Sequence, residues 1–125
     1  MTIEELYAQI GGNYKNACAR LMSGTYVARF IVKFLNDPSC SNIISAWEAG
    51  DERATFDAAH MAKGVCANLG LEELAGLASE VCEALRVGNE DLRASTDVDA
   101  LVAKVGALYG RTRQCIEAFA ASGGA

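Results

Sequence analysis

Apolar residues recur at spacings of three and four positions through most of the chain, and no stretch alternates with a sustained period of two. The first spacing places apolar side chains on one side of an α-helix, whereas the second is typical of a half-buried β-strand. The sequence therefore predicts an all-α fold. A chain of 125 residues fits one domain, which can bury a core without disulfides or a structural metal.

Capping residues, glycines and the single proline divide this pattern into helices. Thr2 with Glu5 forms a capping box for the first helix, and Thr96 with Asp99 forms a weaker one for the last. Pro38 ends the helix before it, because proline disfavours helical geometry in the preceding residue. We expect long helices over 51–69, 71–87 and 96–120, with 88–95 as a polar connector.

These helices predict an antiparallel four-helix bundle with additional short N-terminal helices. We assign residues 1–23 to short helices that pack on the bundle, residues 24–120 to the bundle itself, and residues 121–125 to a disordered tail. Val98, Leu101, Val105, Leu108, Thr112, Cys115 and Phe119 mark the expected buried face of the last helix.

Charge and composition exclude several classes of function. The net charge is −5 and the basic residues are scattered along the sequence, which argues against nucleic acid as a partner. No apolar stretch approaches the roughly 20 residues of a membrane span, and the first residues do not resemble a secretory signal. Five widely spaced cysteines with one histidine favour free thiols, mostly in the core, over a zinc site. We expect a cytoplasmic monomer without membrane insertion.

The only histidine of the chain, His60, lies within the expected helix 51–69. At 100° per residue it falls roughly 150° from the apolar stripe, so the ring is expected in water. Lys63 and Gly64 fall beside it, although a glycine inside a helix costs about 1 kcal/mol relative to alanine. The stripe that defines the buried direction consists of Ala58, Ala59, Ala62, Val65, Cys66 and Leu69.

This arrangement suits a nucleophile. An imidazole with an ordinary pKa of about 6.5 is largely neutral near pH 7, so one ring nitrogen offers a lone pair. Lys63 supplies a positive charge for phosphoryl oxygens, and the absence of a side chain at Gly64 leaves the ring accessible. The alternative is that His60 and Lys63 are ordinary solvated residues. This alternative would not explain the glycine at position 64.

The run from Phe56 to Gly70 contains A-H-x-x-K-G followed by L-G, and it resembles the signature of the histidine phosphotransfer family. This resemblance implies that His60 is the phosphoacceptor, that Lys63 stabilises the phosphoryl group and that Gly64 gives steric access. Two positions depart from the family pattern. Ala62 stands where a leucine is frequent, and Cys82 stands where some members have a glutamine that orients the phosphohistidine.

The resemblance also implies partners. The chain lacks nucleotide-binding and protein-kinase motifs, so the phosphoryl group must come from outside, and we expect a phosphoryl carrier without autonomous kinase activity. Expected partners are response-regulator receiver domains and a hybrid sensor histidine kinase, with Mg²⁺ in the receiver and no cofactor on this chain. The main alternative is a non-catalytic helical interaction module that binds a kinase or receiver domain. A bundle that binds haem or a small molecule ranks last, because the only histidine points outward.

Overall fold

The computed structural model describes residues 1–123, and this part of the chain is helical without strands. The all-α prediction is confirmed. A 3-10 turn, η1, interrupts the path between α3 and α4. The elements are α1 (Ile3–Ile10), α2 (Tyr14–Leu21), α3 (Gly24–Lys33), η1 (Phe34–Asn36), α4 (Ser39–Glu48), α5 (Glu52–Asn68), α6 (Glu72–Leu85), α7 (Glu90–Ser95) and α8 (Val98–Ala121).

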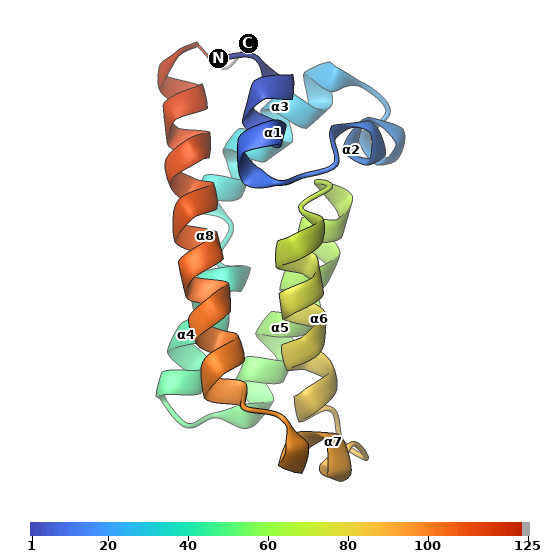
Figure 1. Ribbon diagram of the computed structural model, residues 1–125, viewed down its shortest axis with the longest axis vertical. Coiled ribbons are helices and arrows are strands. Elements are labelled where there is room, and N and C mark those ends of the chain that lie inside the picture. Colours follow the sequence, from blue (N-terminus) through green and yellow to red (C-terminus); the bar gives the residue numbers. More distant parts are fainter. Residues whose placement is uncertain (124–125) are drawn as a thin grey trace.

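Four of these helices, α4, α5, α6 and α8, form the predicted antiparallel bundle (Figure 1). Helix α5 packs against α4 on one side and α6 on the other, and both of these helices also pack against α8. Helix α5 therefore lies diagonally across the bundle from α8. One long side of α5 is covered by no other bundle helix.

Helices α1, α2 and α3 gather at the end of the bundle where α5 turns into α6 (Figure 1). The Tyr7 hydroxyl donates a buried hydrogen bond of 2.7 Å to the carbonyl oxygen of Leu69. The backbone N–H of Asn13 donates one of 2.7 Å to the carbonyl oxygen of Gly70. Gly70 has a φ of 69°, and a Cβ at this position would overlap the Asn13 carbonyl oxygen. The α5–α6 turn is thus fixed from outside by the N-terminal helices.

The connection from α6 to α8 differs from the sequence expectation. Residues 90–95 form the short helix α7 instead of an irregular polar connector. The side chain of Asp97, not that of Thr96, caps α8 and accepts a 3.0 Å hydrogen bond from the Ala100 N–H. The Thr96 hydroxyl donates to the carbonyl of Leu92 at 2.6 Å. Asp99 accepts a 2.7 Å hydrogen bond from Trp47 Nε1, so the predicted second capping box is wrong.

The buried face of α8 is broader than the predicted seven-residue repeat. Leu101 and Cys115 are only half-buried. Val102 and Ile116, one position further along, are buried instead, and Tyr109 is buried next to Leu108. The Tyr109 ring meets that of Phe34 edge-on with centroids 5.8 Å apart. The core-facing side of α8 is therefore rotated toward these positions, while Val98, Val105, Leu108, Thr112 and Phe119 are buried as expected.

The C-terminal end and the cysteines complete the fold. Ala121, the first residue of the expected tail, belongs to α8, and residues 124–125 lie outside the described part of the chain. All five cysteines are free thiols; Cys40, Cys66 and Cys82 are buried, and the other two are half-buried. No helix within residues 1–123 is long and apolar enough to cross a membrane.

Candidate functional site

The orientation of His60 follows from how α5 begins and what it buries. The Asp51 side chain caps the helix by accepting a 3.0 Å hydrogen bond from the Ala54 N–H. Ala59 is fully buried, and His60, the next residue along the helix, is exposed. Ala58 and Val65, which the apolar stripe included, are only half-buried. The face of α5 that packs against α4 and α6 consists of Thr55, Ala59, Ala62 and Cys66.

His60 and Gly64 are both exposed on the uncovered side of α5. Within the described residues no hydrogen bond or ion pair reaches the His60 ring. A Cβ built at Gly64 would find no atom within 4 Å outside its own helix backbone. The space one turn beyond the imidazole is therefore open to an approaching molecule. Arg53, another neighbour on this side, pairs with Asp57 at 3.4 Å.

The Phe56 ring lies one turn before His60 on α5 and stacks on the imidazole. The two rings are nearly parallel, with an angle of 16° and centroids 6.2 Å apart. Phe56 is half-buried, whereas His60 is exposed. An aromatic ring four residues earlier on a helix lies on the same face. Phe56 thus restricts the orientation of the imidazole without occupying its nitrogens.

Lys63 lies on the side of α5 that faces α6. It is half-buried and forms no ion pair within residues 1–123. Its positive charge nevertheless acts on two α6 side chains. Burial raises the pKa of the Cys82 thiol, and the charges of Arg86 and Lys63 oppose this effect. Hydrogen bonds from Arg86 chiefly lower the pKa of the Glu83 carboxyl, and the charges of Arg86 and Lys63 lower it further.

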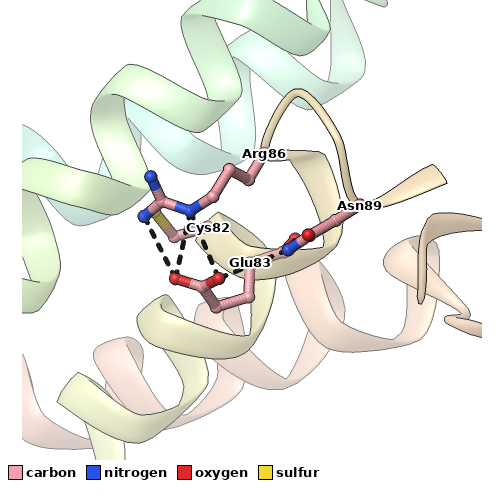
Figure 2. Close-up of polar contacts among 4 residues, drawn as sticks. All are labelled: Cys82, Glu83, Arg86 and Asn89. Atoms are coloured by element: carbon pink, nitrogen blue, oxygen red, sulfur yellow. Dashed lines mark hydrogen bonds and ion pairs between the residues drawn. The ribbon is translucent and has the colours of Figure 1, made fainter. Parts of the chain in front are cut away.

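Cys82, Glu83, Arg86 and Asn89 form a polar cluster at the C-terminal end of α6 (Figure 2). The Arg86 guanidinium binds the Glu83 carboxylate with a shortest distance of 3.0 Å. It also lies 5.3 Å from the centroid of the Phe56 ring. Arg86 and His60 are therefore neighbours of the same aromatic ring. Cys82 is fully buried, and its sulfur lies 3.8 Å from Arg86 Nη2.

The structure thus places His60 and Gly64 on the uncovered side of α5, as the helical wheel predicted, and it places the half-buried Lys63 next to them toward α6. Sequence reasoning missed Phe56 and Arg86. Phe56 could have been found from its position four residues before His60. Arg86 could not, because its place beside Phe56 depends on how α6 is aligned along α5.

Comparison with known proteins adds an independent finding. The family model for the Hpt domain matches residues 37–121, which include α4 to α8 and exclude α1 to α3. Searches of the curated proteins and of the solved structures gave no significant match. The matched segment contains the only histidine of the chain.

The open space at Gly64 leads to a stability prediction. Gly64→Ala should raise the free energy of unfolding by up to about 1 kcal/mol, because alanine removes the entropic cost of a helical glycine and meets no neighbour. Gly70→Ala should lower it, because Gly70 has a positive φ and contacts Asn13. Urea unfolding of both variants measures these effects. A destabilised Gly64→Ala variant would show that this face of α5 is packed.

Proposed function

The chain belongs to the Hpt domain family, which acts in histidine phosphotransfer within phosphorelay signalling, and on this premise we propose that His60 is the phosphoryl carrier. One observation supports this assignment above all others. A histidine phosphotransfer domain needs a histidine that a partner can reach, and the matched segment contains only His60. This residue is exposed on the side of α5 that no bundle helix covers.

The proposed reaction is an in-line transfer from a phosphorylated aspartate of a receiver domain. The lone pair of a His60 ring nitrogen attacks phosphorus, so that an N–P bond forms while the bond from phosphorus to the aspartyl oxygen breaks. The electron pair of the broken bond remains on the aspartate carboxylate. The N–H proton on the other ring nitrogen is free to leave to water. The reverse sequence on a second receiver passes the phosphoryl group on.

The residues around His60 would assist by charge and by access. Lys63, on the α6-facing side of the ring, supplies a positive charge toward phosphoryl oxygens. Arg86 is a second cation beside Phe56. Gly64 leaves room for the receiver surface to approach the imidazole. Phe56 limits the orientations of the ring before attack. Positioning and neutralisation of charge account for most of the catalysis in phosphoryl transfer.

The proposed partners follow from this chemistry. The donor and the acceptor are receiver domains, and a hybrid sensor histidine kinase is the source of the phosphoryl group at the start of the relay. Mg²⁺ would be held by the acidic pocket of the receiver and would neutralise charge on the phosphoryl group there. This chain contributes the nucleophile, the two cations and the docking surface.

The decisive experiment is incubation of the protein with a phosphorylated receiver domain. We expect phosphate on the protein that is labile in acid and stable in alkali. His60→Gln should accept none, yet its free energy of unfolding should change by less than about 0.5 kcal/mol because the side chain is exposed. Phosphate on the His60→Gln variant would disprove the assignment, and a wild-type protein that accepts no phosphate would favour a non-catalytic interaction module.

Lys63 should matter to transfer and not to folding. Lys63→Ala removes one charge-assisted contact with the phosphoryl group, worth about 1.5 kcal/mol, which corresponds to transfer slowed by roughly tenfold. The melting temperature should barely change, since Lys63 forms no ion pair within residues 1–123. Lys104→Ala, on α8 across the bundle, is the matched control. Equal transfer rates for the two variants at physiological salt would exclude the proposed role.

The access role of Gly64 is tested by filling the space. Gly64→Gln should fold, because nothing lies near its Cβ, and it should reduce transfer by at least about tenfold if the side chain blocks the receiver, a loss equal to about 1.4 kcal/mol. Gly110→Gln is the control, because Gly110 is a helical glycine with open space on α8. The transfer rates of both variants are measured in single-turnover reactions with a phosphorylated receiver. Unimpaired transfer to Gly64→Gln would mean that the receiver approaches from elsewhere.

A further inference from the structure

Glu83 is the anion at the centre of the polar cluster on α6 (Figure 2). Its carboxylate accepts hydrogen bonds from Arg86 Nε at 3.2 and 3.3 Å and from Arg86 Nη2 at 3.0 Å. Asn89 Nδ2 donates to the same carboxylate at 3.4 Å and to the Glu83 backbone carbonyl at 2.9 Å. The side chains of Glu83 and Arg86 are each 41% exposed. The pair is therefore well formed but open to solvent and to competing ions.

This anion lies among the cations that serve the proposed phosphoacceptor. Arg86 contacts the Phe56 ring, on which the His60 imidazole is stacked. Lys63 is close enough for its charge to act on Glu83. Glu83 thus interacts with both Arg86 and Lys63, the two cations of the proposed site, and it binds Arg86 directly.

Phosphorylation changes the balance of charge at this point. A phosphoryl group adds between one and two negative charges and three strong acceptor oxygens. Arg86 has a long side chain, and an exposed ion pair such as that with Glu83 is weak. A phosphoryl group on His60 would therefore compete with Glu83 for Arg86. Any gain from pairing Arg86 with the phosphoryl group would be reduced by the loss of its pairing with Glu83.

We propose that Glu83 is a positioning residue that weakens phosphoryl retention on His60 by competing with the phosphoryl group for Arg86. This inference rests on the proposed function. While His60 is unmodified, Glu83 keeps Arg86 occupied. When the phosphoryl group arrives, Glu83 opposes its stabilisation and leaves it easier to pass to a receiver aspartate. The Glu83–Arg86 pair thereby sets the equilibrium between phosphohistidine and phosphoaspartate.

The test measures this equilibrium in the full-length protein. A receiver domain phosphorylated with acetyl phosphate and freed of the donor is mixed with the protein, at concentrations where the complex is sparsely populated. The ratio of phosphohistidine to phosphoaspartate is then read at equilibrium. Glu83→Gln should raise this ratio about two- to fivefold, the change that corresponds to one exposed ion pair.

Glu80→Gln is the matched control, because it removes the same charge from the same helix. Glu80 is exposed and forms no ion pair among the described residues. Its variant should keep the wild-type ratio. Equal ratios for the Glu83→Gln and Glu80→Gln variants would overturn the inference. The proposed function would stand in that case, because it is tested separately by phosphoryl uptake of the wild-type protein and of the His60→Gln variant.

A double-mutant cycle tests whether Glu83 acts through Arg86. Arg86→Gln should lower the ratio of phosphohistidine to phosphoaspartate. In the Arg86→Gln background, Glu83→Gln should no longer raise it beyond the effect of Glu80→Gln in that background. If Glu83→Gln raised the ratio by the same factor with and without Arg86, the competition mechanism would be wrong. Circular dichroism of each variant establishes that the helices are intact.

Discussion

The outward position of His60 depends on the close packing of small side chains on the opposite face of α5. Thr55, Ala59, Ala62 and Cys66 are fully buried there, between α4 and α6. Protein interiors are densely packed, so these positions tolerate little change in volume. Because the helix has a fixed rotation per residue, burying this face fixes the direction of every other side chain on α5. The exposure of the imidazole is thus a property of the core.

Much of the fold could be predicted because its signals are local. The capping box of Thr2 with Glu5 and the end of the helical segment before Pro38 depend only on nearby residues, and both predictions are confirmed. Helix α7 was missed because six residues are too few to show a helical repeat. The cap of α8 was misplaced by one residue because Thr96 and Asp97 are both good capping residues. Their competition is decided by contacts that the sequence does not display.

The surroundings of His60 show the same limit. The exposure of His60 depends only on the rotation of residues around α5, so the helical wheel predicted it. Its contacts with Phe56, and those of Phe56 with Arg86, involve ring orientations and the alignment of α6 along α5. A single sequence does not specify either quantity. The surroundings of Cys82, which departs from the family pattern, are likewise clear only in the structure, where the thiol is buried and contacts Arg86.

The diagonal placement of α5 gives the protein a single open face around a single imidazole. In the proposed relay, the donor and the acceptor receiver must both reach that ring, and they cannot occupy the face together. The two receivers would therefore exclude each other, and the first would have to dissociate before the second binds. Exchange of this kind follows ping-pong kinetics, in which excess unphosphorylated donor inhibits onward flow by occupying the carrier.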